Sequence, residues 1–354
     1  MVSLQRGFDL AKEARIPGPF RILSAGKSGE THNEAKAKGP GFAIGRATNL
    51  GKPQWSDEDF WPLNTTLFAT DFHGNDPRWL FYWFENADLT GFDSGSVQPM
   101  LNRNYIASIS INLPPIEEQT AIATMLRSLD DKIAANQTSI SKIDEILRAL
   151  WQKELSLSNI DVPLSSLASF INGKAFTKGA SGTGRVVVRI AEMNSGIGSR
   201  TVYSDIDAAP DNVVDPGELL FSWSGTLMTK RWPYNQAIVN QHIFKVVPNG
   251  QLDLWALRQA IDAQLEYFQM IAAGKATTMG HIKRGDLDQE VEVPAQMSEE
   301  TNQLGNSLWG LATSLEIQNL QLARTRDELL PLLMSGRITV GEAEDAADEA
   351  ASES

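Results

Sequence analysis

Apolar residues recur with a 4–3 spacing in two long stretches of the chain. The first series has one polar member, Asn136, and its apolar members are Ile122, Leu126, Leu129, Ile133, Ile140, Ile143, Leu147 and Leu150. The second series lies at a constant offset of 182, has polar members Gln318 and Thr325, and consists otherwise of Leu304, Leu308, Leu311, Leu315, Leu322, Leu329 and Leu332. A 4–3 repeat over about four heptads predicts coiled-coil helices.

The ends of both helices carry residues that favour those positions. Pro115 and Glu117-Glu118 suit a helix start, and Gly336 suits the end of the second helix, shortly after Pro331, which should weaken its last turn. Each helix would span about 39 residues, or about 58 Å. We expect the two to pair antiparallel within the chain, because Asn136 and Gln318 interrupt them at matching places. An intermolecular coiled coil is the alternative.

The segments before the two helices resemble each other. Leu4–Gly7 resembles Phe170–Gly173, Leu63–Phe68 resembles Val239–Phe244, and Gly95–Met100 resembles Gly274–Met279. Short apolar runs between Gly, Asn and Pro indicate strands mixed with helices. The predicted fold is therefore α+β, with two globular α/β domains, two long antiparallel coiled-coil helices and an internal pseudo-two-fold repeat. We place the domains at 1–112 and 159–295 and the helices at 113–158 and 296–338.

Charge is unevenly distributed along the chain. The net charge of −13 divides into −1 for residues 1–112, −2 for 113–158, −2 for 159–295 and −8 for 296–354. The segment 339–354 holds six acidic residues and no basic one, and we predict a disordered, solvated tail there. The two domains are close to neutral, so each can carry a local basic face.

Motifs for catalysis and for cofactors are missing. There is no cysteine, and Gly26-Lys27-Ser28 lacks the glycine that a phosphate-binding loop needs, because Arg21 stands there. The four histidines, His32, His73, His242 and His281, are not at metal-ligand spacing. We expect no catalytic residue, no cofactor and no metal. The N-terminus lacks a signal-peptide pattern, and no apolar run reaches the length of a membrane span, so we expect a cytoplasmic protein.

The run Leu113-Pro-Pro-Ile-Glu-Glu-Gln119, with Ile122-Ala123, Leu129-Asp130 and Lys132-Ile133, resembles the central conserved helix of type I restriction–modification specificity subunits. Leu329–Ile338 resembles their second conserved helix, and the order of domain, helix, domain and helix covers nearly the whole chain. The resemblance implies that each domain recognises one half of a bipartite site in double-stranded DNA. It also implies that the helices set the spacing and dock two methyltransferase subunits, and that restriction subunits, which act as translocase and nuclease, join the full complex. The subunit itself is then not an enzyme.

DNA contact requires hydrogen-bond donors for base edges and cations for phosphates. Candidates in the first domain are Arg6, Lys27, Ser28, Arg46, Lys52, Asn102 and Arg103. Candidates in the second domain are Lys174, Arg189, Lys230, Arg231, Lys275, Thr277, Thr278, His281, Lys283 and Arg284. For Trp223 a buried position is favoured over an exposed contact. Residues expected to hold the helix pair together are Leu126, Leu129, Ile133, Asn136, Ile140, Leu308, Leu311, Leu315, Gln318 and Leu322.

One part of the repeat has no match. Ile160–Leu167, which resembles a strand leading into the second domain, has no counterpart before Val2. Either residues upstream of Met1 or another segment should therefore fill that edge of the first domain.

Two other functions stay open: a scaffold whose domains bind proteins or ligands, and a complete methyltransferase. The second is disfavoured because Leu113-Pro-Pro-Ile116 lacks the amide and the aromatic residue of that catalytic motif.

Overall fold

The computed structural model describes residues 1–26, 29–47, 49–89, 91–94, 100–107, 109–274 and 280–352. The chain forms two compact units, residues 1–131 with 322–354 (unit 1) and residues 132–321 (unit 2). The two long helices, α3 (Ile116–Leu157) and α6 (Glu299–Met334), contribute to both units. Within its described part, the protein has no helix long and apolar enough to span a membrane.

Unit 1 contains a four-stranded antiparallel sheet in the order β1-β7-β4-β5 and a three-stranded sheet in the order β3-β2-β6, in which β2 and β6 are parallel. Its strands are β1 (Ser3–Arg6), β2 (Phe20–Leu23), β3 (Thr31–His32), β4 (Gly41–Gly45), β5 (Pro53–Ser56), β6 (Phe60–Pro62), β7 (Thr66–Asp71), β8 (Asp93–Ser94) and β9 (Met100–Leu101). Its helices besides α3 and α6 are η1 (Lys12–Ala14), α1 (Pro77–Asn86), α2 (Arg103–Ile106) and α7 (Val340–Ser352).

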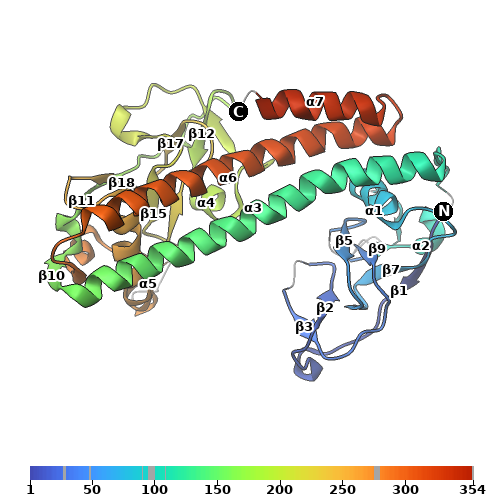
Figure 1. The fold of residues 1–354 in the computed structure, drawn as a ribbon, viewed down its shortest axis with the longest axis horizontal. Helices are drawn as coiled ribbons and strands as arrows, with labels where there is room; N and C mark the ends of the chain where they lie inside the picture. The colour runs from blue at the N-terminus through green and yellow to red at the C-terminus, as the bar shows by residue number, and fades with distance from the viewer. Residues whose placement is uncertain are drawn as a thin grey trace. The chain divides into compact units, whose positions relative to one another are not determined.

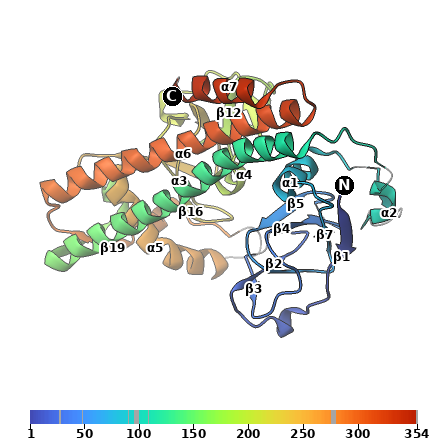
Figure 2. The ribbon, with the colours of Figure 1, turned by 45° about the vertical axis from the view of Figure 1, so that its right-hand side comes forward.

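Helix α1 connects the larger sheet of unit 1 to α3 (Figure 2). It begins at Asp76, whose carboxylate accepts hydrogen bonds from the backbone N–H groups of Arg78 and Trp79 at 2.8 and 2.9 Å. Its side chains Trp79, Tyr82 and Phe84 are buried between β4 and α3. The Tyr82 hydroxyl donates to Asp130 on α3 at 2.5 Å, and this burial and hydrogen bond raise the pKa of Tyr82. The sheet, α1 and α3 thus share one core.

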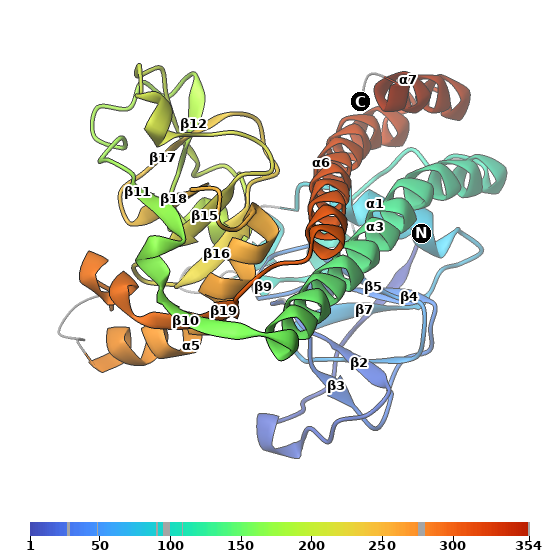
Figure 3. The ribbon, with the colours of Figure 1, turned by 60° about the vertical axis from the view of Figure 1, so that its left-hand side comes forward.

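Unit 2 repeats this plan. Its four-stranded antiparallel sheet has the order β11-β18-β15-β16, and its second sheet has the order β13-β12-β17-β14, with β12 and β17 parallel. The strands are β10 (Asn159–Pro163), β11 (Ala168–Asn172), β12 (Arg185–Val188), β13 (Val202–Ser204), β14 (Val213–Val214), β15 (Leu219–Ser222), β16 (Met228–Arg231), β17 (Ala237–Val239), β18 (Ile243–Pro248) and β19 (Glu290–Pro294). The helices are η2 (Leu164–Ser166), α4 (Ile190–Ser195), η3 (Pro210–Asn212), α5 (Leu254–Gly274) and η4 (Arg284–Asp288). Strands β10 and β19 form a separate antiparallel pair near α5 (Figure 3).

The predicted internal repeat is confirmed, with one shift in its alignment. Arg6 pairs with Leu67 in unit 1, and Asn172 pairs with Phe244 in unit 2. The first strands are therefore related by an offset of 166 and the partner strands by 177, so that Phe244 corresponds to Leu67. The sequence comparison matched Phe244 with Phe68, and that match was wrong by one residue. Strand register depends on hydrogen bonds that side-chain similarity does not reveal.

A glycine ends the first strand of each sheet for the same steric reason. A Cβ atom on Gly7 would overlap the backbone carbonyl oxygens of Pro62 and Leu63, and one on Gly173 would overlap those of Val239 and Asn240. Only glycine allows this close approach of two backbone segments. The matching glycines were therefore a genuine signal of the repeat.

The two long helices lie antiparallel, as predicted (Figure 1). The amide of Asn136, which is 3% exposed, donates to Gln318 Oε1 at 2.7 Å and to Asn319 Oδ1 at 2.9 Å. Asn136 and Gln318 are counterparts in the repeat, so a local two-fold axis of the helix pair passes between them. Near one end of this pair, Glu154 accepts hydrogen bonds from Thr301 Oγ1 at 2.6 Å and Ser298 Oγ at 2.9 Å. The predicted fold class is confirmed.

The two helices differ in which residues of the 4–3 series they bury. On α3 every member of the 4–3 series is buried or half-buried. On α6, however, Leu304 and Leu311 are 45% and 50% exposed, so the prediction that Leu311 holds the pair together was wrong. Trp309 and Ala312 are buried instead, in the core of unit 2. The reason is that α6 must cover the sheet of unit 2 as well as α3, and the larger apolar area of that core determines which face is buried.

The acidic C-terminal segment also differs from its prediction. It forms helix α7, which lies beside the end of α6 (Figures 1 and 2). Gly336, with φ of +67°, ends α6 as predicted. Thr339 and Glu342 then form a capping box, in which Glu342 Oε2 accepts from the Thr339 N–H at 2.8 Å. Ala343 is fully buried in the core of unit 1, so the small residues between the acids make an apolar face that the charge count did not reveal.

Candidate nucleic-acid interface

Four of the predicted DNA-contacting residues of unit 1 line one cavity of about 350 Å³. They are Arg6, Arg46, Asn102 and Arg103, and the remaining lining residues are Gln5, Leu67, Leu101 and Asn104. The lining consists of three arginines, three amide side chains and two leucines, and no acidic residue is found among these described positions. Such a set offers cations for phosphates and paired donors for base edges.

The backbone fixes where these side chains begin. Arg6 ends β1, directly before the glycine that packs against the β6–β7 connection. Arg46 follows β4, where its N–H donates to Thr65 O and its carbonyl accepts from Leu101 N, both at 2.8 Å. The Asn102 side chain accepts from Asn104 N at 2.9 Å and starts α2, which carries Arg103. The cavity is therefore formed by strand ends and a helix start, positions from which side chains can reach a ligand.

The arginines at this cavity are weakly engaged within the protein. Arg6 lies 3.6 Å from Asp9, but both side chains are more than half exposed, so this ion pair contributes little. Arg103 is exposed and Arg46 is half-buried. Lys52 is different, because its ammonium donates to Glu85 O at the last turn of α1 at 2.7 Å. Lys27 and Ser28 lie outside the described residues.

Unit 2 has a cavity of about 1040 Å³ that matches the unit 1 cavity in part. Ile171 and Asn172 take the places of Gln5 and Arg6, and Arg284 and Gly285 line it from η4, which corresponds to α2. Its lining differs in charge, since it includes Asp211 and Asp288. The two units therefore present the same scaffold with different side chains.

In unit 2 the position that corresponds to Arg46 of unit 1 is occupied by Trp223, which belongs to an aromatic cluster. The backbone of Trp223 makes the same two hydrogen bonds as that of Arg46, to His242 O at 3.1 Å and from Ile282 N at 3.0 Å. Its indole N–H donates to Asn172 Oδ1 at 2.9 Å. The ring lies 5.0 Å from that of His242 and 6.4 Å from that of His281, measured between centroids. Trp223 is half-buried, and sequence reasoning gave it no place in the site.

Comparison with known proteins identifies part of the chain directly. Residues 23–145 match the family model described as type I restriction modification DNA specificity domain. This segment is therefore similar to a type I specificity domain. The predicted resemblance to the specificity subunits of type I restriction–modification systems is thereby confirmed.

One solved structure supports the fold over nearly the whole length. The crystal structure of a type I restriction-modification system S subunit from M. genitalium matches with a TM-score of 0.56 at 16% identity, covering 94% of this chain and 93% of that one. The HsdS subunit from Thermoanaerobacter tengcongensis gives a TM-score of 0.31 at 15% identity, covering 88% of this chain and 81% of that one. The first likeness shows that both units and both long helices belong to one shared fold.

One predicted contact, Arg231, does not fit the structure, and two others form hydrogen bonds within the protein. Arg231 is 2% exposed and its guanidinium donates to both carboxylate oxygens of Glu316 on α6, at 2.9 and 3.1 Å. Arg189 donates twice to Glu192, at 2.7 and 3.0 Å. Burial alone would raise the pKa of Glu192, but the hydrogen bonds from Arg189 outweigh it and the pKa lies below the ordinary value. Lys52 is exposed and its ammonium donates one hydrogen bond to the α1 carbonyl, so of the three residues only Arg231 is kept from DNA by burial.

The other candidates of unit 2 divide into three groups. Lys174, Lys283 and Arg284 are exposed, and Lys283 and Arg284 begin η4. Lys230 is half-buried on β16, and His281 is half-buried beside Trp223. Lys275, Thr277 and Thr278 lie outside the described residues. The observed repeat, rather than the number of basic residues in a segment, selects the residues that line matching parts of the two cavities.

Proposed function

We propose that this chain is the DNA-recognition subunit of a type I restriction–modification complex, in which each unit recognises one half of a bipartite site. One observation supports the proposal: the two units place polar side chains at partly matching cavities, formed in both units by the end of the first strand and the first turn of a short helix, and in unit 1 also by the loop after β4. A duplicated scaffold with different side chains is what recognition of two different half-sites requires.

The chemistry of the cavities supports this assignment. In unit 1, the guanidinium groups of Arg6, Arg46 and Arg103 can bind guanine or phosphate with two donors each, and Asn102 lines the same cavity. In unit 2 the indole and imidazole rings around Trp223, together with Arg284, offer a more apolar surface that suits thymine methyl groups. The near-neutral charge of both domains means that specific contacts, rather than a general attraction to phosphate, contribute most of the affinity.

The helix pair has a separate role in this proposal. Helices α3 and α6 set the spacing between the half-sites and dock two methyltransferase subunits, and restriction subunits join in the full complex. Adenine methylation and cleavage are then carried out by the partners in the cytoplasm, and the chain itself needs neither a catalytic residue nor a cofactor.

Methylation mapping in cells tests the proposal. The chain is expressed with its cognate methyltransferase subunit, and methylated adenines are mapped by sequencing for the wild type, Arg103→Ala and Arg284→Ala. We expect Arg103→Ala to relax one half-site and Arg284→Ala the other, each by a factor of roughly 5 to 150, which corresponds to about 1–3 kcal/mol for a bidentate base contact. Lys38→Ala is the control, because that side chain is 90% exposed and pairs with Asp59 outside the cavity.

The outcomes separate the alternatives. If both variants lower methylation equally at all sites, the arginines contact phosphates and do not select bases. If the wild-type chain with its partner methylates no split sequence and a DNA footprint is absent, the chain is a scaffold. Methyl transfer by the purified chain alone would contradict the non-catalytic role.

A further inference from the structure

The side chain of Asn172 is held in one orientation by a neighbouring tryptophan. Asn172 is the last residue of β11 and lines the unit 2 cavity, where it takes the place of Arg6. The side chain is exposed, but its Oδ1 accepts a hydrogen bond from Nε1 of Trp223 at 2.9 Å. An indole N–H can only donate, so the amide oxygen has to face it and the amide NH₂ group points away from it. The group that Asn172 offers to a ligand is therefore its NH₂ donor.

Both partners of this hydrogen bond are fixed by the surrounding structure. The backbone carbonyl of Asn172 accepts from Nδ2 of Asn212, which is 3% exposed, at 3.2 Å. The half-buried ring of Trp223 lies 5.0 Å from that of His242 and 5.9 Å from that of Phe244, measured between centroids. The backbone of Trp223 is held by hydrogen bonds at both its N–H and its carbonyl. The amide is thus ordered before a ligand binds, which lowers the entropic cost of recognition.

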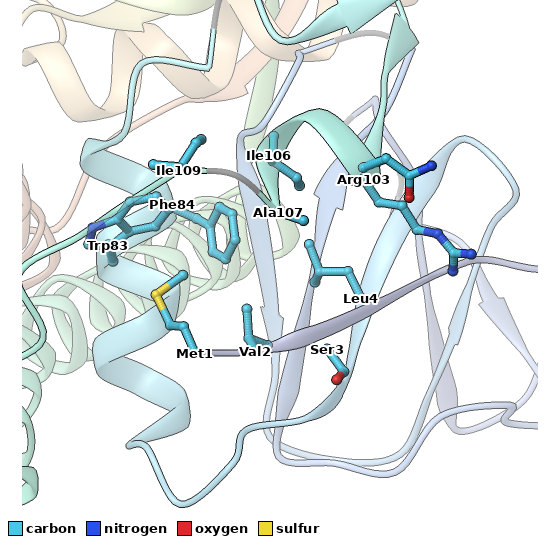
Figure 4. A pocket seen from close by; sticks show the side chains of 11 residues that line it. Met1, Val2, Ser3, Leu4, Trp83, Phe84, Arg103, Ile106, Ala107 and Ile109 are labelled. Carbon is cyan, nitrogen blue, oxygen red and sulfur yellow. The ribbon is translucent and has the colours of Figure 1, made fainter.

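The corresponding position in unit 1 does not need an orienting partner. It is occupied by Arg6, whose guanidinium presents donors in every orientation. The same holds for Arg103, which lines both the unit 1 cavity described above and a second cavity of about 440 Å³. Figure 4 shows its guanidinium pointing away from the apolar side chains Phe84 and Ile106 of that second cavity. An amide differs from a guanidinium, because a rotation of its end by half a turn exchanges a donor for an acceptor.

The orientation of the amide determines which bases it can recognise in the major groove. Guanine and thymine present hydrogen-bond acceptors there, cytosine presents a donor, and adenine presents one of each. The NH₂ group of Asn172 can donate to guanine or thymine, but it meets cytosine with a donor against a donor. Adenine is recognised by the oxygen and the nitrogen of an amide together, and the oxygen of Asn172 is already bonded to Trp223.

We propose that Asn172 selects guanine or thymine at one position of the half-site that unit 2 recognises, and that Trp223 is the positioning residue that fixes this choice. The inference rests on the DNA recognition proposed above and adds the chemical class of the base. The exposed side chain of Arg284 lines the same cavity from η4, so a cation accompanies the amide donor there.

Methylation mapping with matched variants tests the inference. The chain is expressed with its cognate methyltransferase subunit, and methylated adenines are mapped for the wild type, Asn172→Asp and Trp223→Phe. In Asn172→Asp one carboxylate oxygen still accepts from the indole, and the other replaces the NH₂ donor by an acceptor. In Trp223→Phe an aromatic ring is retained, but the N–H that orients the amide is lost. Asn194→Asp is the control, because it makes the same chemical change on an exposed side chain of α4 outside the cavity.

We expect Asn172→Asp to reverse the preference at one position of one half-site from guanine or thymine to cytosine, by a factor of roughly 5 to 150. Trp223→Phe should accept both kinds of base at that position, because the amide is then able to rotate. The control variant should keep the wild-type sequence, and the other half-site should be unchanged in all variants. A purely structural role of either residue would lower methylation at all sites alike and leave the base preference unchanged.

The outcomes distinguish this inference from the proposed function. Unchanged base preference in Asn172→Asp overturns the inference, while a split sequence methylated with the wild-type chain still supports DNA recognition. A wild-type preference for cytosine or adenine at the affected position overturns it too. A reversal in Asn172→Asp without loosened selection in Trp223→Phe overturns the positioning role of the indole. If the wild-type chain with its partner methylates no split sequence, the proposed function fails and the inference fails with it.

Discussion

The buried ion pair of Arg231 and Glu316 allows a sharp test of the structure against the expectation from sequence. If Arg231 contacts DNA, its loss weakens recognition of one half-site and leaves the fold intact. If it is a structural side chain, Arg231→Ala destabilises unit 2 and leaves the half-site preference of the folded protein unchanged. In the first case half-site recognition changes, and in the second the free energy of unfolding changes.

The contacts of Arg231 determine how much stability Arg231→Ala should lose. The Arg231 side chain is 1% exposed, makes two hydrogen bonds to Glu316 and lies 4.7 Å from the centroid of the Trp309 ring. Its Nη1 is 3.8 Å from Asp144 without a hydrogen bond, and Asp144 keeps Arg258 at 3.1 Å. Breaking a buried pair costs about 3–5 kcal/mol. Because the Glu316 side chain is 21% exposed and water can reach it, we expect the lower end, about 3 kcal/mol.

Urea denaturation followed by far-UV circular dichroism measures the loss in free energy of unfolding of Arg231→Ala. Hydrogen exchange of peptides from unit 2 assigns this loss to that unit. The double variant Arg231→Met with Glu316→Leu should lie within about 1 kcal/mol of the wild type, because replacing both charges by apolar groups avoids an unpaired buried carboxylate. Arg324→Ala, which removes an 80% exposed partner of Glu328, should change stability by less than about 0.5 kcal/mol. Wild-type stability of Arg231→Ala with relaxed recognition of a half-site would refute the reasoning.

Three further predictions concern the ends of α6, helix α7 and the repeat. Hydrogen bonds from hydroxyl groups at the start of α6 hold the pKa of Glu154 below its ordinary value of 4.5. The contribution of Glu154 to stability is therefore present above pH 4.5 and is lost as the pH falls further. When the free energy of unfolding is measured as a function of pH, Glu154→Gln should lose less stability in acid than the wild type. Ala343→Asp should destabilise unit 1 by about 2 kcal/mol or more and Ala346→Asp hardly at all, because only Ala343 is buried; equal melting temperatures would mean that α7 is not packed. Gly7→Ala should cost about 1–3 kcal/mol in urea denaturation, while Gly26→Ala, with open space around it, should not.

Part of this structure could be predicted from residue spacing alone. The series from Ile122 to Leu150 lies on the inner face of α3, and the two polar positions Asn136 and Gln318 meet each other. Gly336 ends α6, and Gly7 and Gly173 mark the same close approach in both units. These features depend on local periodicity and on backbone conformations that few residues allow, and both are visible in a single sequence.

The candidate site was predictable only in part. Arg6, Arg46, Asn102 and Arg103 were selected as donors, and the fold brings them to one cavity. The same reasoning selected Arg231, because a sequence does not show which basic residue pairs with a half-buried carboxylate 85 positions away. It also missed the place of Trp223, which became clear only from the backbone hydrogen bonds it shares with Arg46.

Tertiary packing decided the remaining features. Leu304 and Leu311 continue the heptad spacing but are exposed, because Trp309 and Ala312 on another face of α6 have the larger core to cover. The acidic segment after Gly336 forms α7 because the apolar face around Ala343 meets the core of unit 1. Spacing determines which residues share a face of a helix, but the surface that the face meets is assembled from distant segments, and the burial available there determines which face turns inward.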